Sequence, residues 1–418
     1  MSARTGVFAR IVPGLAKSRG IIKAGYAKGA AAAQAQTLWK VEILSRTGVG
    51  RCPQWLSAFA QERKDHRYYE IVEDTIDQGF EYGYFALKDG CGEIRAVQPF
   101  FVNDQDLLTG TSSKIRKLAA AVRSLWPRFL RMRTLMIGCA VGEGHLDAGD
   151  EVPRFLAADS LASAIPDQAR RLKTKLVVFK EFTLADRAAL TCLLDKGFTR
   201  IPSMPMTRVK LNCASFEDYL RNVLSRNMRS KLRRKFKESE RLASLEMRIV
   251  TDVTPYIAGI YPLYLAVYER SSLHFEKLTP EYFCELGQKM PDKVLFFLWF
   301  RGSDIVAFNL CMTEGKSIYS EYIGFDYSVS FDLHLYYVAV RDVMEWAIAN
   351  KYQWYCSTAL NYEPKFHLRH ELYPLDLYVK HTSLIFNFGL KRALPFLEPV
   401  RYETMLKQFP NYRDLHTK

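Results

Sequence analysis

The feature that most constrains the fold is an order of strand and helix signals that occurs twice along the 418-residue chain. In each half, two apolar strands flank a turn that contains glycine, a pattern typical of a hairpin. A third strand follows each hairpin. These strands are expected at residues 83–87, 93–102 and 134–139 in the first half, and at residues 294–300, 305–312 and 317–324 in the second.

The parallel continues beyond the third strand. Each half then has a helical stretch, an apolar strand and a last strand-like stretch, an order that describes a mixed sheet with helices packed on it. The sequence therefore predicts an α/β (α+β) protein with two tandem domains, each a mixed sheet covered by helices. The helices are expected at residues 153–172 and 333–350, and the strands at residues 176–179, 206–211, 353–356 and 375–379.

The length of the chain agrees with two domains, because one hydrophobic core rarely grows beyond about 250–300 residues. We expect a basic N-terminal segment at residues 1–38, a first domain at residues 39–212 and a second at residues 213–418. The active site is expected in the second domain.

Composition narrows the class of protein. No stretch approaches 18 uninterrupted apolar residues, so no transmembrane helix is expected. The eight cysteines stand singly, without a C-x-x-C pair, which favours a reducing cytoplasm and argues against a structural zinc site. We therefore expect a cytoplasmic protein with no metal and no permanently bound cofactor.

The net charge of +14 is concentrated in two regions. Residues 1–41 hold seven Lys or Arg and no acid, and residues 221–241 hold nine against two glutamates. The first region is either a disordered basic tail or a helix that lies on an anionic membrane. In the second case one face of the helix would hold Phe8, Ile11, Val12 and Leu15. A membrane-bound form would sit on the inner face of the cytoplasmic membrane.

The second region, residues 216–242, is expected to form one long helix. Apolar residues recur every four positions from Leu220 to Phe236, which gives a narrow apolar stripe. Three readings of the cationic face stay open: a solvated surface, an anion-binding face, or a nucleic-acid contact carried by charge alone. The candidate anion-binding residues on this face are Arg226, Arg229 and Arg233.

Three segments resemble the FemAB-like family of GNAT-fold transferases. Residues 222–235 (NVLSRNMRSKLRRK) look like the element that opens the second half of that family. Residues 275–283 (FEKLTPEYF) resemble the segment before its central hairpin, and residues 354–372 (WYCSTALNYEPKFHLRHEL) resemble a loop with basic residues before the last strand. The resemblance covers residues 175–385 well and the first 150 weakly.

The resemblance implies two GNAT-like domains and direct transfer of an acyl or aminoacyl group to a primary amine. One departure concerns the donor, because GNAT acetyltransferases hold the CoA pyrophosphate on a glycine-rich turn. Here residues 324–328 contain a single glycine, and the turn at residues 141–144 is not followed at once by a helix. The donor therefore stays open between acyl-CoA, an acyl carrier protein and a charged tRNA.

Attack by an amine on a thioester requires a base and a proton donor. Glu321 and Tyr322 stand on the expected central strand of the second half, and His334 and Tyr336 follow it. We interpret Glu321 or His334 as the base and the tyrosines as proton donors, although a structural carboxylate and a packed or capping histidine are the alternatives. No serine-hydrolase order, H-E-x-x-H motif or complete P-loop occurs.

Residues 365–370 alternate basic and apolar side chains. The alternation indicates either a strand with one wet face or a set of cations for a substrate phosphate or carboxylate. The candidate substrate-binding residues are Lys365, His367 and Arg369.

Three functions follow from these observations. The first is N-acyl transfer from acyl-CoA or an acyl carrier protein to a lipid or long-chain amine, with a sphingoid base as the specific acceptor, as in the GNAT-like bacterial ceramide synthases. The second is FemAB-type transfer from aminoacyl-tRNA to a peptidoglycan precursor, the one case in which nucleic acid is a partner. The third is a membrane-surface adaptor without catalysis.

Overall fold

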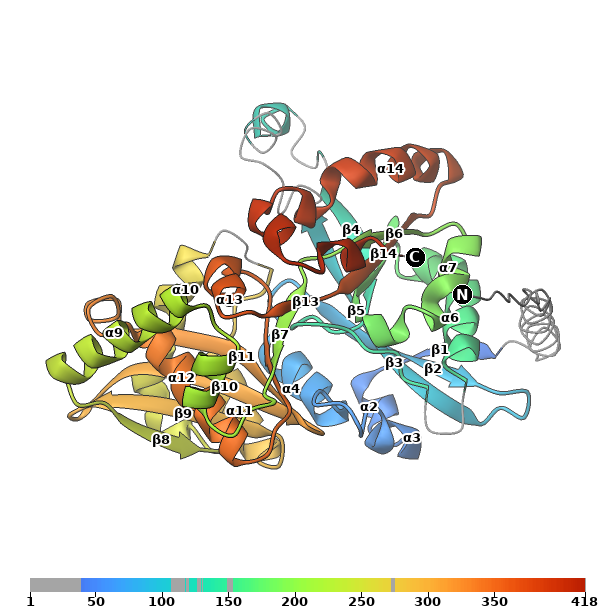
Figure 1. Cartoon of the computed structure of the whole chain (residues 1–418). Coiled ribbons are helices and arrows are strands. Elements are labelled where there is room, and N and C mark those ends of the chain that lie inside the picture. Colours follow the sequence, from blue (N-terminus) through green and yellow to red (C-terminus); the bar gives the residue numbers. More distant parts are fainter. Residues whose placement is uncertain are drawn as a thin grey trace, which may run out of the picture.

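The protein consists of two seven-stranded mixed sheets with helices packed on them (Figure 1). The basic segment 1–38, with its two open readings, lies outside the described residues. The computed structural model describes residues 39–106, 117, 120–125, 129, 131–148, 153–271 and 275–417.

The first sheet has the strand order β1-β2-β3-β4-β5-β14-β6. All neighbouring strands are antiparallel except β4 and β5, which are parallel. The first predicted hairpin is confirmed as β2 and β3. The strands are β1 (Lys40–Leu44), β2 (Glu81–Lys88), β3 (Ile94–Asp106), β4 (Arg131–Ile137), β5 (Leu176–Thr183), β6 (Thr199–Pro202) and β14 (Leu375–His381).

The second sheet repeats this plan in the order β8-β9-β10-β11-β12-β7-β13. Its one parallel pair is β11 and β12, at the same place in the order as β4 and β5. The predicted duplication of a mixed sheet is confirmed. The strands are β7 (Met206–Lys210), β8 (Glu246–Val250), β9 (Val294–Arg301), β10 (Asp304–Glu314), β11 (Ser317–Phe325), β12 (Trp354–Ser357) and β13 (Glu371–Tyr373).

The two sheets exchange one strand each. β14, from the end of the chain, lies between β5 and β6 of the first sheet, and β7, from the first half, lies between β12 and β13 of the second. Both inserted strands are antiparallel to their neighbours. The sequence analysis found both strands but assigned each to the sheet of its own half. The exchange couples the halves through main-chain hydrogen bonds.

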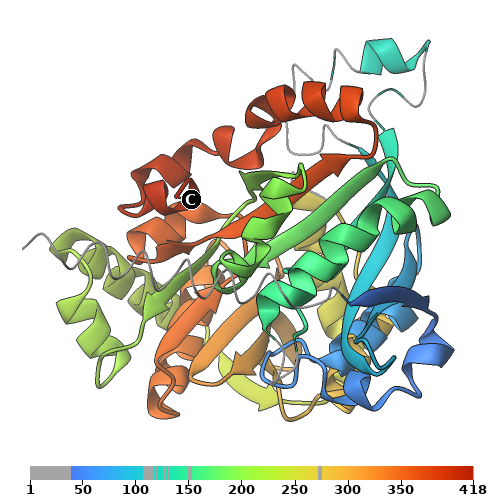
Figure 2. The ribbon, with the colours of Figure 1, turned by 90° about the vertical axis from the view of Figure 1, so that its right-hand side faces the viewer.

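The helices cover both faces of the sheets, so the central strands are apolar throughout rather than alternating. Figure 2 shows α6 crossing the face of the first sheet, and α12 takes the corresponding place between β11 and β12. The predictions of a helix at residues 153–172 and at residues 333–350 are confirmed. The helices are α2 (Arg46–Val49), α3 (Pro53–Ser57), α4 (His66–Thr75), α6 (Arg154–Arg171), α7 (Cys192–Asp195), α8 (Phe216–Asn222), α9 (Arg226–Leu242), α10 (Ile257–Arg270), α11 (Pro280–Lys289), α12 (Leu335–Ala349), α13 (Tyr362–His367) and α14 (Leu384–Leu397).

The prediction of a single helix over residues 216–242 is wrong. Two helices, α8 and α9, occupy this range, and α9 begins at Arg226 after the N-cap Ser225. The Ser225 side chain accepts the Met228 N–H, a bond that stabilises a helix start and competes with helix continuation. Leu232 and Phe236 of the predicted stripe are buried against the core of the second half.

One hydrophobic core joins the two halves. It contains side chains of α4 and β2 from the first half and of α10, α11 and β9 from the second. The hydroxyls of Tyr68 and Tyr282 lie 2.8 Å apart within it. Gly324 of β11 allows α10 to approach, because a Cβ there would lie 2.7 Å from the main chain of Leu263. None of the described helices combines the length and the apolar character that a membrane-spanning helix requires.

Candidate active site

A cavity of about 890 Å³ lies between the two halves of the protein. Residues of β4, β5, β14 and β6 of the first sheet and residues of α10, β11 and α12 line this cavity. The loop between β12 and α13 and the helix α14 also contribute lining residues. Apolar side chains make up most of the wall on the first sheet: Met136, Leu176, Val178, Ile201, Leu375, Leu377 and Val379.

The central strand β11 carries an irregularity where it borders the cavity. Leu310 of β10 pairs with Tyr322, but the next residue, Cys311, pairs with Ser320, so Glu321 is an extra residue in the ladder. The parallel pairing of β11 with β12 ends at Ser320 and Ser357, one residue earlier. Bulges of this kind re-aim side chains beside active sites. Here the bulge coincides with the point where β11 and β12 stop pairing and the cavity begins.

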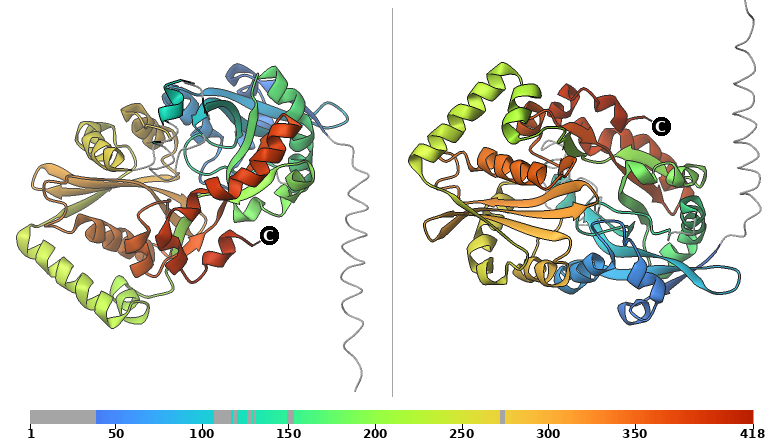
Figure 3. Two further views of the ribbon diagram at one scale, coloured as in Figure 1. Left: turned by 90° about the horizontal axis from the view of Figure 1, so that it is seen from above. Right: turned by 60° about the horizontal axis from the view of Figure 1, so that its bottom comes forward.

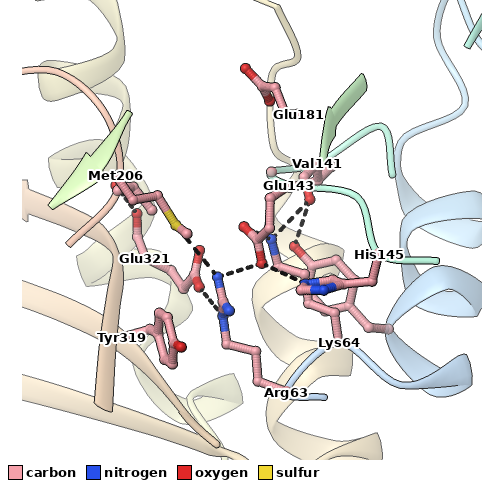
Figure 4. Close-up of polar contacts among 12 residues, drawn as sticks. Arg63, Lys64, Val141, Glu143, His145, Glu181, Met206, Tyr319 and Glu321 are labelled. Atoms are coloured by element: carbon pink, nitrogen blue, oxygen red, sulfur yellow. Dashed lines mark hydrogen bonds and ion pairs between the residues drawn. The ribbon is translucent and has the colours of Figure 1, made fainter. Parts of the chain in front are cut away.

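Glu321 belongs to a buried network of charges that crosses between the halves (Figure 4). Its Oε1 accepts the Arg63 Nε at 2.6 Å, and Arg63 also pairs with Glu143. Lys64 donates to Glu143 Oε2 at 2.8 Å. The Arg63 guanidinium lies over the Tyr319 ring, 3.7 Å from its centroid. Glu143 and Glu321 line the cavity, so the network forms its charged corner.

The charges in this network are mutually compensated. Burial alone would raise the pKa of Glu143, but the cations of Arg63 and Lys64 hold this pKa well below its ordinary value. Burial likewise opposes the charge on His145, yet its hydrogen bond to Glu143 and the nearby Glu62 raise the His145 pKa. Buried charges are tolerated only when paired and hydrogen-bonded, and this network meets that condition.

The turn at residues 141–144 has a structural role in this network. Gly142 has φ of +81°, and a Cβ there would lie 2.1 Å from the Lys64 Nζ. A Cβ at Gly144 would lie 2.7 Å from the Lys180 carbonyl oxygen. The glycines therefore allow the turn to pack over the two lysines, and Gly142 also lines the cavity.

A second polar group lies on the cavity wall beside β11. The Tyr322 hydroxyl donates to Glu276 Oε1 at 3.0 Å, and both residues line the cavity. Burial raises the pKa of Glu276, although the Lys180 ammonium and the Tyr322 hydroxyl each act to lower it. Burial raises the pKa of Tyr322 well above its ordinary value, and Glu276 adds to that effect. A carboxylate with a raised pKa next to a protonated phenol can accept and relay a proton.

Lys180 of β5 also lines the cavity, and its charge acts on Glu276. Its Nζ donates to the Gly142 carbonyl and to Glu181 Oε2, both at 2.7 Å. Burial opposes its charge, but Glu181 and Glu276 keep the pKa of Lys180 above its ordinary value. Glu181 also accepts the Ser203 hydroxyl at 2.9 Å and has φ of +56°, which is uncommon for a residue other than glycine. This backbone strain lies on the cavity wall.

Lys365 of α13 is another buried residue that lines the cavity. Its Nζ donates to the carbonyl oxygens of Thr358 at 2.5 Å and of Leu360 at 2.8 Å. Burial lowers its pKa to about 7. Two carbonyl partners leave one of the three ammonium donors for a ligand. Tyr336 of α12 also lines the cavity, and burial raises the pKa of its hydroxyl well above the ordinary value.

The structure brings Glu321, Tyr322, Tyr336 and Lys365 of the predicted site residues to one cavity. His334 is not among the described residues that line it. His334 Nε2 instead lies 3.0 Å from Glu238 Oε2 of α9, and the residue has φ of +50° at the N-cap of α12.

The other basic candidates also lie away from the cavity. His367 and Arg369 are exposed, and of the two readings of residues 365–370 the strand with one wet face is wrong, because α13 extends to His367. The buried Lys365 and Leu368 fit the spacing of one helical turn. The remaining candidates lie on α9: Arg226 and Arg233 are exposed and Arg229 is half-buried.

Glu276, Lys180, Arg63 and Glu143 were missed by the sequence analysis. Glu276 lies in a segment that carried the family resemblance, but nothing marked its carboxylate as a cavity residue. Arg63 and Glu143 acquire their roles only through contacts with Glu321 and Lys64. In the described ranges we find no cluster of three or more His, Cys, Asp or Glu side chains suited to a metal ion.

Solved structures with a similar fold include FemX, with a TM-score of 0.48 and 11% identity over 81% of this chain and 96% of that chain. The structure of L-PGS from Bacillus licheniformis has a TM-score of 0.44 and 12% identity over 79% and 97% of the two chains. A tandem GNAT protein from the clavulanic acid biosynthesis pathway has a TM-score of 0.43 and 11% identity over 82% and 99%. No curated protein matches the sequence significantly.

A family match covers about half of the chain. Residues 153–360 match the FemAB-like family, which is described by its role in peptidoglycan biosynthesis or recognition. The matched range contains Glu276, the bulged strand β11 and the helix α12. The chain belongs to the FemAB-like family, as the resemblance of its sequence indicated.

Proposed function

We propose that the protein transfers an acyl group from a thioester to the primary amine of a lipid, within the cavity between its halves. The observation that supports this function best is that one cavity combines an apolar wall with polar residues suited to proton transfer. A long apolar wall on the first sheet faces a bulged strand with Glu321 and Tyr322, and Glu276 hydrogen-bonds to Tyr322. The apolar wall suits a hydrocarbon chain, and the polar side suits proton transfer at the reacting amine.

In the proposed reaction, the neutral amine nitrogen attacks the thioester carbonyl carbon and forms the new C–N bond. The C–S bond then breaks and the thiolate leaves. Glu276 takes the proton that the amine nitrogen loses, because burial raises its pKa and so makes it a better base. Tyr322 donates its proton to the thiolate and recovers one from Glu276. The products are an amide and a free thiol.

The remaining candidates have supporting roles in this proposal. The Glu321 carboxylate is already paired with Arg63. We therefore assign Glu321 to stabilising the bulge in β11, and Glu276 to proton transfer. Lys365 has one donor left for a polar group of the substrate. The donor is acyl-CoA or an acyl carrier protein, and a sphingoid long-chain base is the acceptor to test first, because it joins a primary amine to a long chain. The proposed place of action is the cytoplasm, at the inner face of the cytoplasmic membrane.

The description of the matching family favours a second candidate function. In this case the donor is an aminoacyl-tRNA, the acceptor amine belongs to a peptidoglycan precursor, and the bond that breaks is an ester. The cations of α9 would then face the tRNA. The same proton relay serves both reactions, because each is the attack of an amine on an activated carbonyl.

The two candidates are separated by supplying each donor with each acceptor. Purified protein is incubated with palmitoyl-CoA, palmitoyl carrier protein or alanyl-tRNA, and with sphinganine or a lipid-linked peptidoglycan precursor. Amide products are measured by mass spectrometry. Amide formation from a thioester and sphinganine supports the proposal. Products only from alanyl-tRNA support the second function, and no amide from any pair contradicts both.

A further inference from the structure

The helix α14 exposes an unusual number of large apolar side chains. Elsewhere in the described chain such residues stand singly, as is normal for a soluble surface. Along α14 four of them lie within residues 384–388 and a fifth lies about two turns further along the helix; we call these five side chains the apolar patch, and contiguous exposed patches mark interaction surfaces. The exposed fractions are 84% for Leu384, 83% for Ile385, 66% for Phe386, 62% for Phe388 and 60% for Phe396.

The two sides of α14 are both apolar but face different surroundings. Leu390, Leu394 and Leu397 line the cavity, at a spacing that keeps them on one side of the helix. Ile385 and Phe388 lie on the other side of the helix and are largely exposed. α14 is therefore a wall of the cavity and a part of the outer surface at the same time.

The charged residues within α14 are all basic. From Leu384 to Leu397 the helix contains Lys391 and Arg392 and no acidic residue, and Glu398, Arg401 and Glu403 follow it, so this end of the chain keeps a small positive excess. The Arg392 guanidinium lies 3.5 Å from the centroid of the Phe388 ring, and that of Arg401 lies 5.0 Å from the Phe396 ring. Cations that pack along aromatic rings while their heads stay in water are typical of residues at a lipid interface.

We propose that α14 docks the protein on an anionic lipid bilayer, with its outer apolar side chains in the headgroup region. Fourteen residues make a helix about 21 Å long, short of the ~20 residues that cross a bilayer, so α14 would lie in the membrane plane. The side chains of the apolar patch would insert into the headgroup region of the bilayer. The positive charges of Lys391, Arg392 and Arg401 would complement the negative charge of the lipids.

The position of α14 agrees with this role. It runs along the outside of the molecule, whereas the basic helix α9 lies at the other end (Figures 1 and 3). The docked surface would place the cavity wall formed by Leu390 and Leu394 next to the lipid. Docking through α14 is thus a separate contact from any attraction of α9 to anions, and it does not depend on the transfer reaction.

Vesicle flotation of the full chain tests the proposal without any assay of transfer. The vesicles contain phosphatidylcholine with about 30% phosphatidylglycerol, and binding is measured at low salt and at about 1 M salt, where the Debye length is ~3 Å. The test variant is Ile385→Ser/Phe386→Ser, and the matched control is Leu56→Ser/Phe331→Ser, an exposed pair outside α14. Both pairs are exposed, and thermal unfolding verifies that each variant folds.

We expect the wild type to bind at low salt and to keep part of its binding at high salt. The α14 variant should bind at least about tenfold more weakly, and the control like the wild type. A Phe388→Trp variant should show a blue-shifted emission when vesicles are added. Equal binding by the α14 variant and the wild type would overturn the proposal. So would a failure of the wild type to float, including the case in which the patch joins two copies and sedimentation shows a dimer that the variant loses.

Discussion

The Nε of Arg63, in the segment between α3 and α4, lies 2.6 Å from Oε1 of Glu321, on the central strand of the second sheet. The two residues are 258 positions apart and both are buried. Through this pair and through Glu143, each half of the chain supplies one side of the charged corner of the cavity. This corner of the cavity therefore depends on both halves, whereas the sequence predicts an active site in the second half.

Removal of Arg63 should strongly destabilise the protein. Arg63→Met leaves Glu143 and Glu321 in a buried place without their main cation, and such losses cost about 3–5 kcal/mol. The free energy of unfolding, measured with urea at pH 7, should fall by about this amount. The control is Arg241→Met, which changes an exposed arginine at the end of α9. Its free energy of unfolding should fall by less than about 0.5 kcal/mol.

A double variant separates charge from packing at this position. In Arg63→Met/Glu321→Gln one of the two carboxylates is also neutral, so part of the loss should be recovered. If Arg63→Met unfolds at the wild-type urea concentration, the buried ion pair does not stabilise the protein.

Loss of the proposed base should slow transfer. Glu276→Gln removes the proton acceptor but keeps the size of the side chain, so kcat should fall by about 10²-fold or more with little change in KM. In the wild type, kcat/KM should rise with pH as Glu276 loses its proton, at a pH above the ordinary carboxyl range because burial raises its pKa. The variant should lack this rise.

Glu281→Gln is the matched control for the base. Glu281 lies five residues further along the chain and is exposed at the start of α11. The transfer rate and pH profile of the Glu281→Gln variant should therefore match those of the wild type. Equal rates for Glu276→Gln and the wild type, with a donor and acceptor that the wild type uses, would exclude Glu276 as the base.

Lys365 should make stability depend on pH above neutrality. Its pKa is about 7 in the folded protein and 10.5 ordinarily, because burial disfavours the charge. Between these values the unfolded chain binds a proton that the folded chain does not, so unfolding becomes more costly as pH rises from about 7 to 10.5. Below pH 7 both states carry the proton and this dependence ends.

Unfolding of Lys365→Met at pH 6 and pH 9 measures this contribution. The wild type should gain stability relative to the variant as the pH is raised between the two values, and Lys316→Met, at an exposed lysine, should follow the wild type. A constant difference between the wild type and Lys365→Met at both pH values would show that Lys365 titrates normally.

His334 should prove dispensable for transfer. It lies outside the cavity lining, and its ring contacts Glu238 and Lys235 of α9. His334→Asn keeps a residue type that accepts the left-handed backbone at φ of +50°. The transfer rate should stay within about twofold of the wild type, and stability should fall by no more than about 1 kcal/mol. A loss of rate approaching that expected for Glu276→Gln would return His334 to the site.

Much of the fold could be read from local patterns. Apolar runs bounded by glycine turns gave both hairpins, and the spacing of Leu335, Val338 and Val343 gave the helix α12, because burial imposes its period on the sequence. The break between α8 and α9 was missed because Ser225 interrupts the helix without interrupting the apolar stripe. The alternation at residues 365–370 misled because α13 ends at His367, so these residues span the end of a helix and the turn after it.

The sequence by itself determined the family, the duplicated order of strands and helices, and four of the residues that line the cavity, among them Glu321 and Lys365. Only the tertiary structure decided that β7 and β14 exchange sheets, that Arg63 meets Glu321, and that Glu276 faces Tyr322. The physical reason is that local order follows from side-chain period and turn chemistry, which neighbouring residues carry. Ion pairs, raised or lowered pKa values and cavity walls depend on burial and on partners far away in the chain, and these exist only after the two halves pack together.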